Sequence, residues 1–242
     1  MTYKRVEHLA EGVTLYQGDM MDVLPTLGRF DACVTDPPYG IGEASGKAKT
    51  RTSGKGSSIG RGNKYVRDYG NDTWDDAPIS DDQINSILEI AKYQIIFGGN
   101  YYNLGPTSCW LVWDKLNGDN DFADCELAWT NLKKAVRRIK FLWCGCMRQE
   151  RHITREHPTQ KPVGVMDWCI GHLPPDVSTI IGPFMGSGTT GVAAVKRGKC
   201  FTGIERESKY FDIACRRIEA ALKTPDMFVA PRAVPEKQET FI

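Results

Sequence analysis

The sequence predicts an α/β fold, a mostly parallel sheet with helices on both faces. Short apolar runs alternate with helical segments along the 242 residues, and this alternation is typical of a parallel sheet covered by helices. Late in the chain, the stretch STIIGPFMGSGTTGVAAVKRG reads as a strand, a glycine-rich turn and a helix. Such a turn is typical of Rossmann-like sheets, in which it opens a nucleotide site.

The expected strands are short apolar runs bounded by glycine or polar residues. They cover 13–17, 31–35, 94–98, 109–113, 178–182 and 199–205, and a less regular pair around 136–145 is expected as a hairpin at the sheet edge. Helices are expected over 80–92, 162–173 and 208–222. Ser80 and Gln83 match a capping box, and Pro162 suits a first helical turn.

Composition favours a single domain over 1–225 followed by a tail, 226–242. Hydrophobic residues make up 41% and charged residues 25% of the chain, as in ordinary globular proteins. No apolar run approaches the roughly 20 residues of a membrane span, and the start lacks a signal-peptide core. The eight cysteines lack the usual zinc spacings. We therefore expect a cytoplasmic protein with reduced thiols and no metal site.

Basic residues are concentrated in two stretches, although the net charge is only +1. Residues 44–67 hold seven lysines and arginines and no acid, and a second basic stretch runs over 133–155. Local patches of this kind indicate binding of phosphate groups. The glycine- and serine-rich segment 41–75 that contains the first patch is too long for a plain connection, so it is functional or disordered.

The glycine-rich turn predicts an adenosine site. Gly186, Gly188 and Gly191 match G-x-G-x-x-G, and Glu205 follows 19 residues after Gly186, where an acid takes the ribose hydroxyls. Only one strand and one helix follow the turn, so the other strands must come from earlier residues. Asp36, at the end of the strand 31–35, can then share the same crevice.

Three motifs occur in a specific order: DPPYG (36–40), HPTQKP (157–162) and FMGSGTT (184–190). Together they resemble the β-class, permuted DNA amino-methyltransferases of the N6-adenine type, and the resemblance extends over 18–219. It implies a circularly permuted methyltransferase order, S-adenosylmethionine as cofactor and double-stranded DNA as substrate. It also implies a role in restriction-modification. A homodimer stays open beside a monomer.

The resemblance assigns the reaction to DPPY. An adenine amine is a poor nucleophile, because its lone pair is delocalised into the ring. If Asp36 and the Pro37 carbonyl accept its two N–H hydrogens, the nitrogen can pyramidalise and attack the sulfonium methyl group. Pro38 would fix the turn. Tyr39 would stack on the target base, which must leave the duplex.

The resemblance also implies a set of cofactor residues. The expected contacts are Asp19 near the adenine, Asp36 beside the reacting centre, Lys161 and Pro162 at the carboxylate, Phe184, Gly186, Ser187, Gly188 and Thr189 under the methionine portion, and Glu205 at the ribose. His157 is expected to be a structural residue of its turn. Residues 41–75 and 133–156 are the expected target-recognition regions.

Gly182 departs from the family pattern, which has Asp before Pro183. We expect weaker cofactor binding, or another acceptor for the cofactor's ammonium group, and a calorimetric comparison with Gly182→Asp tests this. N4-cytosine methylation, a nicotinamide oxidoreductase and a relative that binds without turnover remain alternatives. Trp113 with Lys115 and the pair Tyr101 and Tyr102 are either pocket residues or ordinary structural ones.

Overall fold

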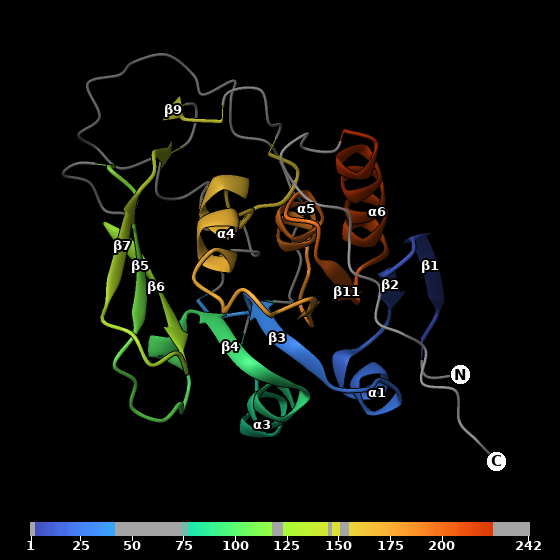
Figure 1. Ribbon diagram of the computed structural model, residues 1–242, viewed down its shortest axis with the longest axis horizontal. Helices are drawn as coiled ribbons and strands as arrows, with labels where there is room; N and C mark the ends of the chain where they lie inside the picture. Colours follow the sequence, from blue (N-terminus) through green and yellow to red (C-terminus); the bar gives the residue numbers. More distant parts are fainter. Residues whose placement is uncertain are drawn as a thin grey trace.

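A computed structural model describes residues 3–41, 75, 77–117, 123–144, 147–150 and 155–224. Most of the segment 41–75 and the whole tail 226–242 therefore lie outside the described residues. The fold is the expected α/β fold, with a mixed but mostly parallel sheet between two layers of helices (Figure 1).

The described strands form one large sheet in the order β1-β2-β11-β10-β3-β4-β6-β5-β7. Neighbours are parallel from β2 to β4 across β11, β10 and β3, and again between β5 and β7. They are antiparallel at β1–β2, β4–β6 and β5–β6. The strands are β1 (Arg5–Ala10), β2 (Val13–Gln17), β3 (Phe30–Thr35), β4 (Ala91–Phe97), β5 (Trp110–Asp114), β6 (Cys125–Thr130), β7 (Arg137–Lys140), β10 (Thr179–Gly182) and β11 (Cys200–Glu205).

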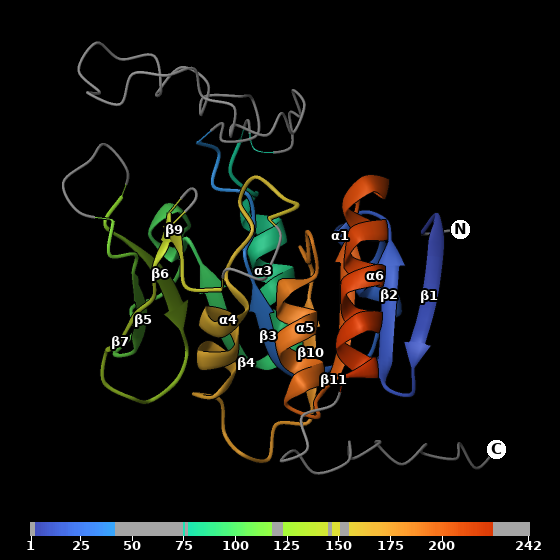
Figure 2. The same cartoon turned by 90° about the horizontal axis from the view of Figure 1, so that it is seen from above.

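Helices cover both faces of this sheet. On one face lie α4 (Val163–Ile170), α5 (Thr189–Lys196) and α6 (Ser208–Lys223), and on the other lie α1 (Met20–Val23) and α3 (Asp81–Ile90) (Figure 1). Short turns of 3-10 helix occur at η1 (Leu24–Thr26) and η2 (Gly99–Tyr101). Figure 2 shows α4, α5 and α6 side by side along the sheet, and each contacts the next. No described helix is long and apolar enough to cross a membrane.

Local sequence signals explain where several elements begin. The capping box is present at α3, where Ser80 Oγ accepts from Gln83 N at 3.3 Å and Gln83 Oε1 accepts from Ser80 N at 3.0 Å. Pro162 lies one position before the first turn of α4, as its N-cap. β3 and β10 occupy the sheet centre, and their apolar side chains Ala32, Val34 and Ile180 are fully buried.

The last two strands of the chain lie in the middle of the sheet. β10 and β11 are inserted between β2 and β3, so the earlier residues supply the flanking strands, as the sequence predicts. Ile180 on β10 pairs with Ala32 on β3 in a parallel register. The carboxyl ends of these two strands therefore lie at the same edge of the sheet, where Asp36 follows β3 and the glycine-rich turn follows β10.

The structure differs from the prediction at the sheet edges. The expected hairpin around 136–145 is instead the edge strand β7, parallel to β5, and a separate two-stranded sheet of β8 (Trp143–Cys144) and β9 (Met147–Arg148). β1 and β6 were not predicted. Both carry polar residues within short runs, RVEHLA and CELAWT, so their hydrophobic pattern is weak. Their strand conformation depends on pairing with neighbouring strands of the sheet.

Candidate active site

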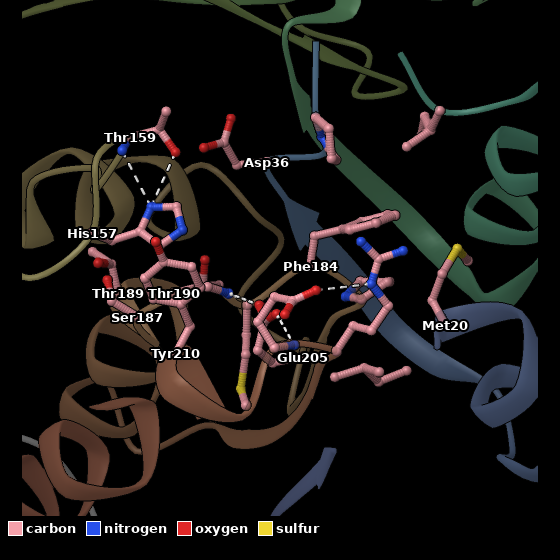
Figure 3. Close-up of a pocket in the computed structure, with 18 of the residues that line it drawn as sticks. Met20, Asp36, His157, Thr159, Phe184, Ser187, Thr189, Thr190, Glu205 and Tyr210 are labelled. Carbon is pink, nitrogen blue, oxygen red and sulfur yellow. Dashed lines mark hydrogen bonds and ion pairs between the residues drawn. The ribbon is translucent and has the colours of Figure 1, made fainter. Parts of the chain in front are cut away.

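A pocket lies at the edge of the sheet where β2, β3, β10 and β11 end (Figure 3). Asp36 and Glu205 enter it from different strands, and the glycine-rich turn forms part of its wall. The pocket therefore brings together residues as far apart in the sequence as Gly18 and Tyr210. The expected site residues among its lining are Asp19, Asp36, Pro38, Lys161, Phe184, Gly186, Ser187, Thr189 and Glu205.

Four other expected residues lie next to the pocket without lining it: Pro37, Tyr39, Pro162 and Gly188. Tyr39 contacts Asp36 directly, since its hydroxyl donates to Asp36 Oδ1 at 2.5 Å. Gly188 begins α5 beneath the turn, and Pro162 begins α4. Their assigned contacts with base or cofactor stay predictions.

The glycine-rich turn needs glycine for two different reasons. Gly186 has φ +52° and Gly188 has φ +78°, a left-handed conformation that side chains rarely adopt. A Cβ atom on Gly188 would also lie 2.9 Å from Ala214 Cβ on α6. At Gly186, by contrast, the nearest side-chain atom to such a Cβ would be in His157, at 3.7 Å. The turn is thus packed tightly beneath Gly188 and leaves room for a ligand over Gly186.

Glu205 places a buried carboxylate against this turn. Its Oε2 accepts from Gly186 N at 2.9 Å, and its Oε1 accepts from Glu207 N at 2.8 Å. Burial raises the pKa of Glu205 to about 7, although these backbone hydrogen bonds act in the opposite direction. A third backbone donor, Arg206 N, also acts on this carboxylate, which still has the capacity to accept from ligand hydroxyl groups.

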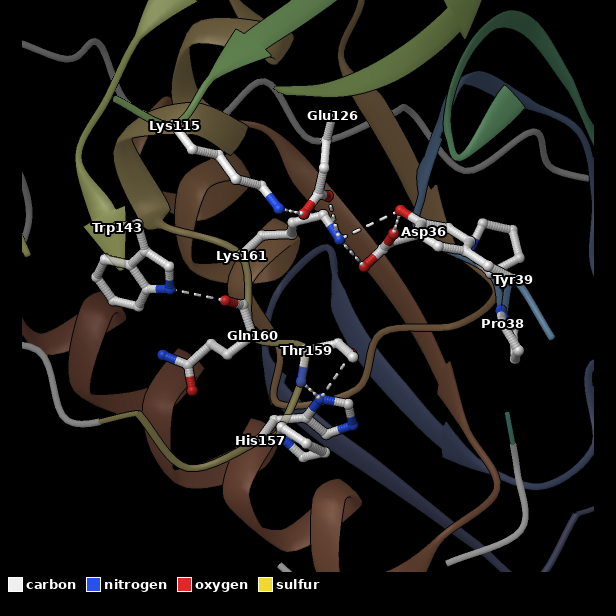
Figure 4. Close-up of polar contacts among 12 residues, drawn as sticks. Asp36, Pro38, Tyr39, Lys115, Glu126, Trp143, His157, Thr159, Gln160 and Lys161 are labelled. Atoms are coloured by element: carbon white, nitrogen blue, oxygen red, sulfur yellow. Dashed lines mark hydrogen bonds and ion pairs between the residues drawn. The ribbon is translucent and has the colours of Figure 1, made fainter. Parts of the chain in front are cut away.

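Asp36 is held by two side chains (Figure 4). Tyr39 donates to one carboxylate oxygen, and Lys161 Nζ donates to the other, Oδ2, at 2.6 Å. Burial raises the pKa of Asp36 even though the ammonium group of Lys161 lowers it. The expected contact of Lys161 with a cofactor carboxylate stays a prediction, because here its ammonium group faces Asp36 and Glu126.

The backbone acceptor expected at Pro37 already has a donor. The hydroxyl of Tyr102 lies 3.0 Å from the carbonyl oxygens of both Pro37 and Pro38. The Tyr102 hydroxyl has one hydrogen, so it can donate fully to only one of these carbonyls at a time. Each carbonyl oxygen has two lone pairs. Pro37 can therefore still accept from a second donor. Tyr102 is thus a residue that positions the DPPY turn.

The aromatic ring of Tyr39 is itself stacked. Tyr101 lies with its ring centroid 5.1 Å away and an interplanar angle of 14°. Tyr101 is 48% exposed, which is unusual for a large aromatic side chain. Gly98 lies against the edge of the Tyr39 ring, where a Cβ atom would overlap it. Tyr101 and Tyr102 therefore both contact the DPPY turn, although neither lines the pocket.

Lys115 and Glu126 extend the polar cluster around Asp36. Lys115 Nζ lies 2.7 Å from Glu126 Oε1, and Lys161 Nζ lies 3.0 Å from Glu126 Oε2. The two lysines lower the pKa of Glu126 to about 2 against the effect of burial. Trp113 is a core residue whose indole N–H donates to Phe141 O at 2.9 Å. Sequence reasoning missed Glu126, since it lies on the unpredicted strand β6.

His157 is buried and lines the pocket, and its Nδ1 accepts from Thr159 N at 3.2 Å. Burial and nearby cations lower its pKa to about 3, so the imidazole is neutral at pH 7. Tyr210 packs edge-on against it, with centroids 4.1 Å apart. These contacts agree with a residue that shapes the turn.

Gly182, the departure from the family pattern, lies at the end of β10. A Cβ atom there would lie 3.3 Å from the Phe201 ring. Gly182 itself does not line the pocket. Gly182→Ala is therefore the matched control for the calorimetric comparison with Gly182→Asp, because both variants add this contact.

Comparison with known proteins places this geometry in context. Residues 106–216 match the family N6_N4_Mtase, described as DNA methylase. The type II methyltransferase M.ScaI of Streptomyces caespitosus is 27% identical over 251 residues, which cover 86% of this chain and 82% of that protein. These matches support a DNA methyltransferase of the N6/N4 family.

Two further relatives match over shorter stretches. The type II methyltransferases M2.DpnII of Streptococcus pneumoniae and M2.LlaDCHI of Lactococcus lactis subsp. cremoris are 37% and 36% identical. Each match spans about a third of the relative's length, 33% and 31%. The family match favours an N6/N4 methyltransferase over the nicotinamide oxidoreductase.

Solved structures share the fold of this chain. The M1.HpyAVI complex with SAM has a TM-score of 0.50 and 22% identity, covering 84% of this chain and 98% of that one. The cytosine-N4-specific PvuII DNA methyltransferase has a TM-score of 0.50 and 14% identity, covering 89% and 91%.

S-adenosylmethionine is the cofactor of this family, as expected from the sequence. The residues of the pocket fit it. The open face over Gly186 accommodates a ligand, and the Glu205 carboxylate offers free lone pairs beside it. In the described residues, no group of three or more His, Cys, Asp or Glu could hold a metal ion.

Proposed function

We propose that the protein is a site-specific DNA methyltransferase that methylates the exocyclic N6 amine of adenine in a flipped-out base, using S-adenosylmethionine. One observation carries the proposal: Asp36 lines the same pocket as Gly186 and Glu205. An acceptor for a substrate amine thus lies beside a site that fits an adenosine. The family match supports methylation of an exocyclic amine in DNA. The order of the motifs favours the permuted arrangement of the β class.

In this proposal the pocket residues bind and orient the cofactor. Glu205 accepts from the ribose hydroxyls, Phe184 packs beside the adenosine, and the turn around Gly186 gives the methionine portion close access to the backbone. Asp19 contributes a carboxylate near the adenine. S-adenosylmethionine supplies a methyl group on a sulfonium centre, and its transfer breaks the C–S bond and leaves a neutral thioether.

Asp36 and Pro37 act on the substrate amine. Each accepts one N–H hydrogen, which localises the nitrogen lone pair and aims it at the methyl group. The nitrogen forms the new N–C bond, and its extra proton then passes to Asp36 or to water. Burial favours this role, because a hydrogen bond to a carboxylate is stronger away from water. No protein nucleophile or histidine base is required.

DPPY favours adenine over cytosine, since N4-cytosine enzymes more often have Ser as the first residue of this motif. N4 of cytosine remains the alternative, because it is an exocyclic amine that the same two acceptors could activate. Double-stranded DNA would reach the pocket past residues 133–156. Within them, Arg137, Arg138 and Lys140 are exposed on the edge strand β7.

A direct assay separates these activities. The full chain is incubated with unmethylated bacterial DNA and S-adenosylmethionine labelled in its methyl group, and the DNA is digested to nucleosides. We expect label in N6-methyldeoxyadenosine. Label in N4-methyldeoxycytidine would establish the alternative. Binding of the cofactor without label in either nucleoside would show a relative that lacks turnover, and would contradict the proposal.

A further inference from the structure

Both oxygens of the Asp36 carboxylate are engaged before any substrate binds. Tyr39 donates to Oδ1 at 2.5 Å, and Lys161 donates to Oδ2 at 2.6 Å. The Lys161 side chain is only 7% exposed, and that of Asp36 is 19% exposed, so little water competes for this ion pair. Each oxygen keeps a further lone pair, but at Oδ2 an arriving amine competes with the positive charge of Lys161, which weakens this oxygen as an acceptor.

Glu126 lies where it can resolve this competition (Figure 4). Its Oε2 is 3.0 Å from Lys161 Nζ, which is close enough for an ion pair. Within the described part of the chain, however, this buried oxygen accepts no hydrogen bond of normal geometry. It is an acceptor within reach of an ammonium group that has three N–H donors and directs one of them at Asp36 Oδ2.

The charges of the cluster alternate along a chain of four side chains. Asp36, Lys161, Glu126 and Lys115 carry negative, positive, negative and positive charge in turn, and consecutive members lie 2.6, 3.0 and 2.7 Å apart. Lys161 thus has two carboxylate partners, and its three N–H donors can serve both at once. Lys115 holds the other oxygen of Glu126, so that oxygen does not compete for Lys161.

We propose that Glu126 is a positioning residue for methyl transfer: by sharing the ammonium group of Lys161, it weakens the hold of this cation on Asp36 Oδ2 and leaves that oxygen a better acceptor for the substrate amine. This inference rests on the proposed function. Lys161 favours the ionised form of Asp36, and Glu126 offsets part of its attraction for Oδ2. Without Glu126, Lys161 would have Asp36 as its sole carboxylate partner and would hold it against the amine.

The test compares Glu126→Gln with Asp167→Asn. Asp167 also pairs with a cation, Arg197 at 2.5 Å, but it does not line the pocket. We expect Glu126→Gln to lower the single-turnover methylation rate by at least about tenfold, while its dissociation constant for S-adenosylmethionine stays within about twofold. Asp167→Asn should leave both values unchanged.

A purely structural role of Glu126 is distinguished by a double-mutant cycle with Lys161→Met. If Glu126 acts by drawing Lys161 away from Asp36, then Glu126→Gln causes no further loss of rate once Lys161 is absent. An equal loss in both backgrounds would overturn the inference. So would a Glu126→Gln variant that methylates DNA at the rate of the unaltered protein.

The pKa of Asp36 can be measured without any methyl transfer. A pH titration followed by ¹³C NMR reports it through the carboxyl resonance of Asp36. Glu126 raises the pKa of Asp36 through its negative charge. We expect this pKa to fall in Glu126→Gln, because that charge is lost and Lys161 bonds Asp36 alone. An unchanged titration would contradict the coupling. If the unaltered protein labels no nucleoside at all, the proposed function is wrong, whatever Glu126 does.

Discussion

Glu205 is a carboxyl group whose surroundings oppose its charge until a ligand binds. Burial raises its pKa to about 7 in the free protein. Ribose hydroxyls donate to the charged form, so their binding favours the carboxylate and lowers that pKa. Below pH 7 Glu205 must lose a proton before it can bind the ribose as a carboxylate, and this lowers the free energy gained on binding. Above pH 7 Glu205 is already ionised, so the full free energy is gained.

We predict that 5′-methylthioadenosine, which has the ribose but no amino acid group, binds about tenfold more tightly at pH 8 than at pH 6. Isothermal titration calorimetry measures this. Glu205→Gln cannot ionise, so its weaker binding should be independent of pH over the same range. A pH dependence that persists unchanged in the variant would exclude Glu205 as its source.

The residues of the site differ in how far the sequence could predict them. Asp36, Gly186 and Glu205 lie in motifs with local signatures, and the structure brings all three to one pocket. Glu126 and Tyr102 act through contacts with distant segments, such as the bond from Tyr102 to Pro37 across 65 positions. Contacts of this kind depend on strand order and register, which no local pattern specifies.

The unit of β10, the glycine-rich turn and α5 is held in place by its packing against α6. Gly188 is a point of close approach, because its missing side chain lets the turn lie against Ala214 and Ile218. This contact fixes where α5 begins, directly after the glycine-rich turn. The strands β2 and β3 matched their sequence patterns closely, whereas the polar strands β1 and β6 had no comparable signal.

We predict that Gly188→Ala lowers the free energy of unfolding by about 1–3 kcal/mol, because the added methyl group overlaps α6 and the residue has a left-handed conformation. Urea denaturation followed by circular dichroism measures it. Gly28→Ala is the control, since a Cβ atom at Gly28 would have no neighbour within 4 Å. Equal stability of the two variants would show that the turn tolerates a side chain.

In the whole molecule, the basic edge strand β7 finishes at the same end of the sheet as the pocket. β7 runs parallel to β5, and Lys140 pairs in register with Asp114, directly before Lys115 of the polar cluster. Lys140 is exposed, and it lies at the same end of the sheet as Asp36. This arrangement fits a DNA backbone that passes across the edge strand towards the pocket.

We predict that Lys140→Ala weakens DNA binding at every sequence and reduces the slope of log affinity against log salt by about 1, because one phosphate contact is lost. Fluorescence anisotropy at several salt concentrations measures the slope. Lys196→Ala, which removes an exposed lysine from the far end of α5, should change neither value. Equal effects of the two substitutions would mean that β7 is not part of the DNA surface.

The central claim is that Asp36 acts on the reacting amine. Asp36→Ala tests it most directly when its single-turnover methylation rate and its dissociation constant for S-adenosylmethionine are measured on the same protein. We predict that methyl transfer is abolished while cofactor binding stays within about tenfold, because the lost hydrogen bonds act on the substrate amine. Methyl transfer at the original rate would contradict the account, and so would a loss of cofactor affinity as large as the loss of rate.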